Sequence, residues 1–227
     1  MCGFWDPVGC RYVIGLLFNK YWYYVPTMKD QFAAASNIFR RSGGILRMSD
    51  AIREGISKRT LYAMRDSGDL EQLSRGLYRL ASLPGLEAPD LVTAASRVPN
   101  GVICLISALA FHDLTTQVPH AVDIAVPKGT ETPRVDYPPL NVYWFSGKAF
   151  SEGVETRIID GVTVRIYNTE KSVADAFKFR NKIGMEIALE ALRSWRKKRG
   201  ARVEDLLTQA RNCRVERVIR PYLEALV

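Results

Sequence analysis

Four consecutive side chains, Ser57, Lys58, Arg59 and Thr60, offer the chemistry that binds a nucleic-acid backbone. Hydroxyl groups and free backbone amides at the start of a helix bind phosphate, and Lys or Arg reaches a phosphate or the edge of a guanine. Further basic and aromatic residues follow on the same helix and on the hairpin after it. We predict a DNA contact made by Ser57, Lys58, Arg59, Thr60, Tyr62, Arg65, Arg75 and Arg79.

The element that must come first in this unit is a helix that begins at Asp30. Apolar residues recur after it at helical spacing, and Gly43-Gly44 then supplies a left-handed helix cap. The inward positions are Phe32, Ala33, Ala35, Ile38 and Phe39. A short extended segment, residues 45–47, follows the glycines.

Two further helices place the basic run. The second is short, capped by Ser49 and ended by Gly55, and the third is capped by Ser57, spans Lys58 to Ser67 and is closed by Gly68. The inward residues are Ala51 and Ile52 on the second helix and Ile56, Leu61 and Met64 on the third. The basic run therefore falls in the first turn of the third helix.

A hairpin completes the unit. Residues 70–80 alternate on either side of Ser74-Arg75-Gly76, which is typical of two strands joined by a tight turn. Three helices followed by a hairpin predict a winged helix-turn-helix, whose third helix enters the major groove. Residues 28–80 hold ten Lys and Arg against six Asp and Glu, a surplus of +4 that favours a polyanionic partner. The alternative is a protein-binding unit with ordinary solvated charges.

The run from Ser42 to Leu80 resembles the N-terminal winged helix of AbiEi-type antitoxins, the regulators of type IV toxin-antitoxin systems. The residues that carry the resemblance are Arg47, Ala51, Gly55-Ile56, Leu61 to Gly68, Leu70 and Ser74-Arg75-Gly76-Leu77-Tyr78. The resemblance implies binding to operator DNA through the third helix, with Arg75 and Arg79 on the wing. It also implies repression of the protein's own operon.

The remainder of the chain has strands first and helices after. A Pro- and Gly-containing linker near residue 85 precedes a helix opened by Asp90; a second short helix is capped by Ser107. A buried strand or turn is predicted at 102–105, and strands are predicted at 121–126 and 141–145. Two more strands, 154–159 and 162–167, are predicted around Asp160-Gly161, which is a strong hairpin signal. Helices are predicted at 169–179, 185–195, 203–210 and 215–226. This order predicts an α+β fold: a winged helix followed by a mixed α+β domain with a helical C-terminal half.

The second unit also resembles the C-terminal part of AbiEi antitoxins. The residues concerned are Ile106 to Thr115, Pro119, Val122 to Pro127, Tyr167 to Ser172 and Asp175. For this half the resemblance implies antagonism of a nucleotidyltransferase-like toxin, without requiring a direct complex. We predict an N-terminal extension at residues 1–27, a winged-helix domain at 28–82 and an α+β domain at 88–227. Our hypothesis is that translation naturally begins at Met28.

Other reactive residues give weaker patterns. A second basic patch, Arg193, Arg196, Lys197, Lys198 and Arg199, is either a solvated helix end or another nucleic-acid contact, with Trp195 packing or stacking. His112 is predicted to end a helix, and adjacent Glu170 and Lys171 lack the alternation of a metal-dependent nuclease. We expect no cofactor, no metal and no catalysis. A DNA-targeted nuclease and a protein-binding adaptor remain the alternatives.

Composition limits these hypotheses. The chain has 227 residues, 47% of them hydrophobic, and a formal net charge of +8. No apolar run approaches the ~20 residues of a membrane span, so a spanning protein is excluded as a class. Four scattered cysteines and two histidines show no zinc-ligand spacing, and a reducing cytoplasm is the expected compartment. Operator DNA is the expected partner.

Overall fold

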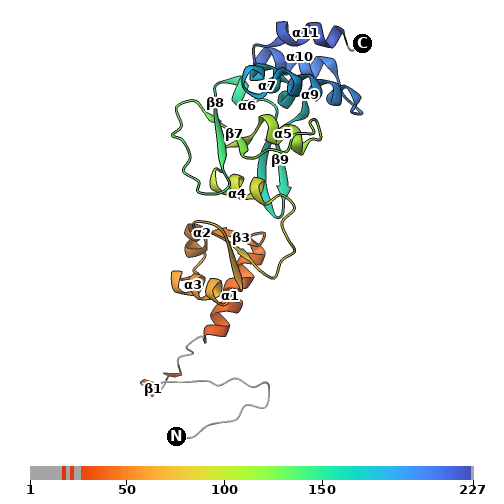
Figure 1. The fold of residues 1–227 in the computed structure, drawn as a ribbon. Coiled ribbons are helices and arrows are strands. Elements are labelled where there is room, and N and C mark those ends of the chain that lie inside the picture. The colour runs from red at the N-terminus through yellow and green to blue at the C-terminus, as the bar shows by residue number, and fades with distance from the viewer. Residues whose placement is uncertain (1–16, 19–20, 23–26, 226–227) are drawn as a thin grey trace.

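The computed structural model describes residues 17–18, 21–22 and 27–225. The predicted extension at residues 1–27 lies almost wholly outside them, so its status stays a prediction. Two short strands, β1 (Leu17–Phe18) and β2 (Tyr21–Trp22), pair antiparallel there. From Thr27 onward the chain builds a lower body of helices and a small sheet, and an upper body of a larger sheet under a helical layer (Figure 1).

The lower body has three helices, as predicted, and the extended segment 45–47 pairs with the predicted hairpin to give a three-stranded sheet. Its sheet has the order β3-β5-β4, and both pairings are antiparallel. In chain order the elements are α1 (Met28–Arg41), β3 (Ile45–Arg47), α2 (Met48–Arg53), α3 (Lys58–Asp66), β4 (Leu70–Ser74) and β5 (Leu77–Leu80). Phe39, Leu61 and Met64 are fully buried between the helices and the sheet.

The start of α1 corrects the prediction that Asp30 opens the helix. Thr27 is the cap residue, and its hydroxyl accepts the Asp30 amide at 3.3 Å while the Asp30 carboxylate accepts the Thr27 amide at 3.1 Å. This reciprocal capping box places Asp30 three residues inside the helix. Of the predicted inward residues, Ala33 is exposed, because α1 buries only the narrow face that carries Ala35 and Phe39.

Helix α2 also differs at its start. Arg47, not Ser49, precedes it, and no side chain caps the free amides. The Arg47 guanidinium instead reaches the carbonyl of Ser96 in the upper body. Only Ala51 is buried, and Ile52 is 40% exposed, because a helix of six residues presents little more than one position to the core.

The upper body is built on a mixed five-stranded sheet of order β8-β7-β6-β10-β9. β7 pairs parallel with β8 and β10 parallel with β6, whereas β6-β7 and β9-β10 are antiparallel. The elements up to the last strand are α4 (Pro89–Arg97), β6 (Val102–Ile103), α5 (Leu105–Phe111), β7 (Val122–Pro127), β8 (Leu140–Phe145), α6 (Lys148–Ser151), β9 (Val154–Ile159) and β10 (Val162–Tyr167). The predicted hairpin at 154–167 is confirmed, with Asp160 and Gly161 both at positive φ in its turn.

Helix α5 begins two residues before the predicted cap Ser107. Its free amides are satisfied from β7 instead: buried Asp123 accepts the Ile106 amide at 3.0 Å, and the Ser107 hydroxyl accepts the Asp123 amide at 2.9 Å. Burial raises the pKa of Asp123, although its hydrogen bonds to Asn141 and to the helix amides oppose the rise. The cap therefore comes from a neighbouring strand.

The helical half packs beyond the sheet, at the top of Figure 1. It comprises α7 (Thr169–Lys178), α8 (Arg180–Ile183), α9 (Met185–Lys197), α10 (Val203–Asn212) and α11 (Glu216–Glu224). Phe177, Leu192 and Trp195 are fully buried in its core. The α+β fold class and the helical C-terminal half are thus confirmed, and no helix in the described part of the chain has the length and apolar character to cross a bilayer.

The two bodies touch along one seam. Ile45 and Leu77 of the small sheet join the apolar cluster that includes Val92 and Val164. At the same place Gly43 and Gly161 approach so closely that a Cβ on Gly43 would lie 2.5 Å from the Gly161 carbonyl oxygen. The predicted division between residues 82 and 88 stays a prediction, and the structure adds a packed contact across it.

Candidate nucleic-acid interface

Helix α3 is held by its first turn. The Ser57 hydroxyl accepts the Thr60 amide at 3.0 Å, which confirms the predicted cap. No acidic residue lies in this turn, and the Ser57, Lys58 and Arg59 side chains are exposed. The amides of Lys58 and Arg59 have no hydrogen-bond partner within the described residues. A capped helix start with exposed cations and free amides is suited to a phosphate.

The outer face of α3 carries three of the predicted contacts in a stripe. Lys58, Tyr62 and Arg65 are spaced by four and three residues, which places them on one side of a helix, and all are exposed. The Arg65 guanidinium lies 5.1 Å from the centre of the Tyr62 ring and 2.7 Å from the Asp66 carboxylate. Leu61 and Met64 occupy the opposite, buried side.

Thr60 is a correction to the predicted site. Its side chain is only 6% exposed, and its hydroxyl lies 2.8 Å from that of Ser57 and 3.5 Å from the Gln31 amide oxygen on α1. The hydroxyl therefore joins α3 to α1 and faces the core of the lower body. Thr60 therefore stabilises the packing of α3 against α1 and is not part of the outer face of α3.

Arg79 is a second correction. It lies on β5 with 4% of its surface exposed, and its guanidinium binds the Glu71 carboxylate at 3.0 Å and the carbonyls of Leu83 and Pro84. These bonds tie the hairpin to the segment that leaves it. A guanidinium enclosed in this way cannot reach DNA. The prediction was wrong because alternation along a strand does not reveal which face of the sheet an arginine lies on.

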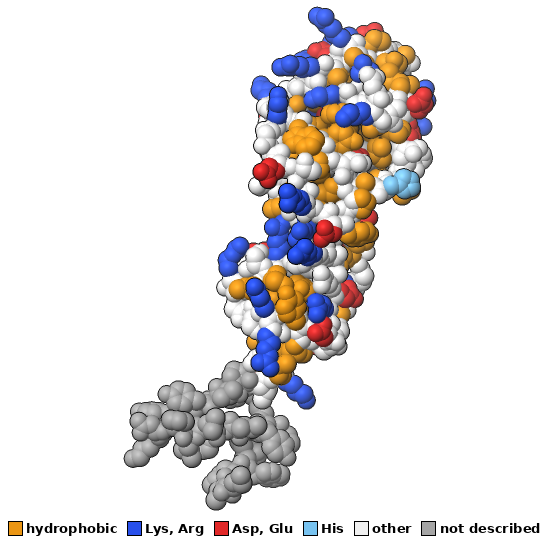
Figure 2. Space-filling view, turned by 60° about the vertical axis from the view of Figure 1, so that its left-hand side comes forward, with side chains coloured by type: hydrophobic (Ala, Val, Ile, Leu, Met, Phe, Trp, Pro, Cys, Tyr) orange, Lys and Arg blue, Asp and Glu red, His pale blue; other side chains and the backbone are white. Residues whose placement is uncertain are grey.

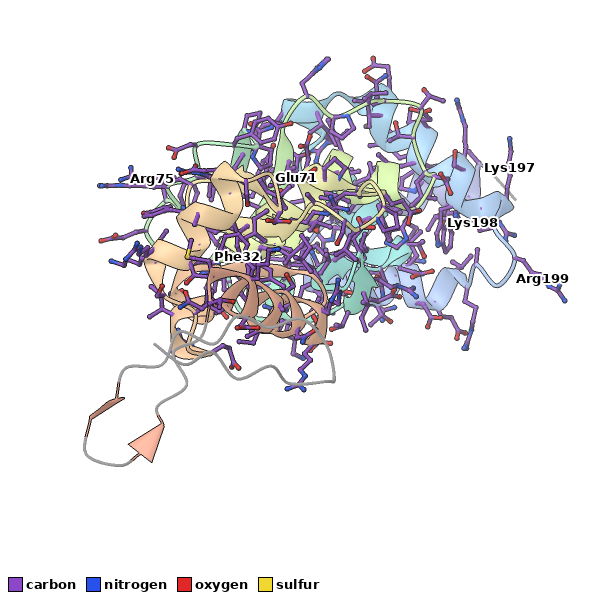
Figure 3. The ribbon with its side chains drawn as sticks, turned by 90° about the horizontal axis from the view of Figure 1, so that it is seen from below. Phe32, Glu71, Arg75, Lys197, Lys198 and Arg199 are labelled. Atoms are coloured by element: carbon purple, nitrogen blue, oxygen red, sulfur yellow. The ribbon has the colours of Figure 1, made fainter. Side chains whose placement is uncertain are left out.

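The tip of the wing is formed by Arg75, whose side chain is exposed and points away from the body in Figure 3. Sequence reasoning missed its neighbour from the upper body: Arg97 on α4 donates to the Arg75 carbonyl at 2.8 Å and to the Arg134 carbonyl at 3.5 Å. Burial lowers the pKa of Arg47, and the charge of Arg97 lowers it further. Basic side chains accordingly gather where the two bodies meet (Figure 2).

The second basic patch is exposed at the end of α9 and just after it, which fits both a solvated helix end and a nucleic-acid contact. Its residues are Arg193, Arg196, Lys197, Lys198 and Arg199. In Figure 3 the last three lie on the side of the molecule opposite Arg75. Trp195 is fully buried and donates to the Glu170 carboxylate at 2.9 Å, so stacking on a base is excluded and the tryptophan packs.

The other reactive residues are tied into the fold. His112 caps the C-terminus of α5, with its Nε2 2.7 Å from the Tyr167 carbonyl, and burial lowers its pKa. Lys171 and Asp175 form a fully buried ion pair within α7. Among the residues that the structure describes, no group of three or more His, Cys, Asp or Glu side chains is arranged to hold a metal ion.

A known family shares the segment that carries this geometry. Residues 34–81 match the sequence profile of the family described as "Transcriptional regulator, AbiEi antitoxin". The winged-helix segment is similar to the AbiEi family. The matched range takes in α3 and the whole wing, so the AbiEi-type segment contains the exposed stripe and Arg75. The chain therefore carries a segment similar to that of AbiEi-type transcriptional regulators.

The fold of the whole chain is also found elsewhere. A crystal structure of the RV2827C protein from Mycobacterium tuberculosis is similar with a TM-score of 0.51 and 12% sequence identity. The similarity covers 88% of this chain and 82% of that one, so it extends beyond the AbiEi-type segment. At this identity it establishes a shared fold. No curated protein matches the chain.

Proposed function

We propose that this protein is a cytoplasmic antitoxin that binds its own operator DNA through α3 and the wing and thereby represses its operon. The observation that carries the proposal is the exposed stripe of Lys58, Tyr62 and Arg65 on a capped helix within the AbiEi-type segment. Helix α3 would lie in the major groove with its first turn toward the bases.

The start of α3 and the wing would contact different parts of the DNA. The free amides and the Ser57 hydroxyl at the start of α3 would hold a phosphate, and Lys58 or Arg59 would reach a second phosphate or a guanine edge. Arg75 would contact the backbone or the minor groove beside the helix. Arg97 would act through the wing, because its bond to the Arg75 carbonyl fixes the position of the wing tip.

The second part of the proposal concerns residues 88–227. We infer that this region opposes a nucleotidyltransferase-like toxin by binding and not by turnover. The support is the antitoxin description of the matched family together with the resemblance in residues 106–115 and 167–175. Expressing the full chain with Lys58→Ala and Arg59→Ala beside a nucleotidyltransferase-like toxin would test this separately from DNA binding. Unrelieved growth arrest would contradict it.

The first experiment measures binding to the DNA upstream of the gene, against a scrambled duplex, by fluorescence anisotropy at two salt concentrations. Lys58→Ala and Arg59→Ala should each reduce the slope of log K against log salt by about 0.9 for each phosphate that the removed side chain neutralises. Lys197→Ala is the matched control, because it removes the same charge on the side opposite the wing.

Binding that does not discriminate the two duplexes would refute an operator-reading role. Unchanged slopes in both helix variants would remove α3 from the interface. A slope that falls equally in Lys197→Ala would mean that net charge or the second basic patch, and not α3 alone, determines binding.

A further inference from the structure

A hollow that is distant in sequence from the wing lies in the upper body between α6, the end of α7 and the end of α10. It has a volume of about 630 Å³, which is within the range of small-molecule sites. Its lining comes from three separate stretches of the chain. The residues are Ser146, Gly147, Lys148, Ala149, Lys178, Arg211, Asn212, Cys213 and Arg214.

The charge of this lining is of one sign. Four of its residues are basic and none is acidic. Arg211 has an acidic partner, since its Nε lies 3.2 Å from the Glu216 carboxylate. Lys148, Lys178 and Arg214 have no ion pair with any residue that the structure describes. The Lys178 ammonium also lies 5.0 Å from the centre of the Phe145 ring and interacts electrostatically with Asp175. Lys148 and Arg214 are therefore the two cations of the lining whose charge has no partner among the described residues.

Helix electrostatics explains only part of this gathering. Lys178 ends α7 and Arg211 lies in the last turn of α10, where cations complement the partial negative charge of a helix C-terminus. Lys148 instead begins α6, and Arg214 lies beyond the end of α10. Because Arg214 directly follows the cap residue of α10, the dipole of that helix also favours a cation there, and only the position of Lys148 is not accounted for by its own helix.

The floor of the hollow adds no negative charge. Cys213 forms it, and its thiol donates to the Asp175 carboxylate at 3.3 Å. Burial raises the pKa of Cys213 to about 12, so the thiol stays protonated at neutral pH. The Asp175 carboxylate beneath it is paired with Lys171. The potential inside the hollow is therefore set by the four cations at its rim.

We propose that this hollow is a binding site for phosphate groups, filled either by the polyphosphate of a nucleotide or by the phosphorylated end of a nucleic acid. Converging cations on different elements bind phosphate oxygens through charge-assisted hydrogen bonds. The site is separate from α3 and the wing, so it gives the α+β region a ligand of its own. It does not depend on operator binding.

Calorimetry on the full chain tests the proposal with four probes: inorganic tripolyphosphate, ATP, and a short single-stranded oligonucleotide with and without a 5′-phosphate. The pocket variant is Lys148→Gln with Arg214→Gln. The matched control is Arg196→Gln with Lys197→Gln, which removes the same charge from the exposed end of α9. The pocket variant should bind tripolyphosphate about tenfold or more weakly than the wild type, and the control within about twofold.

The probes also identify the source of the phosphate. ATP binding more tightly than either oligonucleotide assigns the site to nucleotides, and a preference for the 5′-phosphorylated oligonucleotide over its unphosphorylated form assigns it to nucleic-acid ends. In the wild-type protein, tripolyphosphate should protect Lys148 and Lys178, but not Lys197, from reductive methylation. This readout does not depend on the folding of a variant.

Two results would overturn the proposal. One is the absence of binding by all four probes at millimolar concentration, and the other is an equal loss in the pocket and control variants. Operator affinity should be unchanged in the pocket variant. Failure of the phosphate site and failure of the operator proposal would thus appear in different measurements.

Discussion

Arg75 and Arg79 lie four residues apart on the hairpin, and replacing each with Ala should affect a different property of the protein. Arg79 has a side chain only 5% exposed and is bonded to Glu71 and to two backbone carbonyls. Arg75 is exposed at the wing tip. We expect Arg79→Ala to reduce stability, and Arg75→Ala to weaken DNA binding without reducing stability.

The magnitude for Arg79 comes from its partners. Hydrogen bonds to charged groups contribute about 1.5–3 kcal/mol each when buried. The Glu71 side chain is 54% exposed, so solvent screening limits that ion pair to about 1 kcal/mol or less. The exposed Pro84 carbonyl can bind water after the change, and the buried Arg79 Nε has no partner to lose. A total of about 2–4 kcal/mol follows, against about 5–15 kcal/mol for a typical domain.

Urea unfolding followed by circular dichroism measures the first effect, and anisotropy at two salt concentrations measures the second. Arg79→Lys is the informative control, because it keeps the charge but cannot bind the carboxylate and both carbonyls as a planar fork does. It should lose an intermediate amount of stability. Arg75→Ala should change stability by less than about 0.5 kcal/mol and lower the salt slope by about 0.9.

One pattern would refute this reasoning. If Arg79→Ala left the unfolding midpoint unchanged and flattened the salt dependence of DNA binding, its guanidinium would face the DNA. The hairpin would then present its opposite face to solvent.

Three further outcomes are expected. Asp175→Asn should lower the free energy of unfolding, measured in urea, by about 3–5 kcal/mol because it leaves the Lys171 ammonium buried without its counter-charge. Replacing both residues with apolar ones should lower it much less, and equal losses would contradict the pairing. Gly43→Ala should lower the thermal midpoint, since φ is +78° and the new Cβ would meet Gly161; an unchanged midpoint would argue against the seam. Burial lowers the pKa of His112, so its contribution to stability is present above about pH 6.5 and is lost as pH falls toward the lowered value; His112→Gln should flatten that dependence in pH-resolved unfolding.

Features that depend only on neighbouring residues could be predicted from the sequence. The Ser57 cap and the Asp160-Gly161 hairpin can be predicted because a short stretch of chain contains both the signal and its effect. The inward faces of α3 and α9 follow from helical periodicity alone. The AbiEi resemblance rests on the same local features, and it identifies the winged helix that the family match covers.

The wrong predictions share a physical cause, which is that the deciding partner is far away in sequence. Ser107 is the predicted cap of α5, but Asp123 on a neighbouring strand satisfies those amides. Arg79 is a predicted DNA contact, yet it is enclosed by groups that only the folded chain brings near, whereas Trp195 packs, which is one of its two predicted roles. Arg97 could not be found at all, because its role is a bond to a carbonyl 22 residues earlier.

The bond from Arg97 to the wing also bears on how chains of this kind can be recombined during evolution. A winged helix whose wing tip is bonded to the upper body cannot be exchanged for another winged helix by a simple crossover in the linker. The new winged helix would need a backbone carbonyl within reach of Arg97 and a glycine at the position of Gly43, opposite Gly161. New operator specificities should therefore arise by substitution on the outer face of α3, within an inherited pair of bodies.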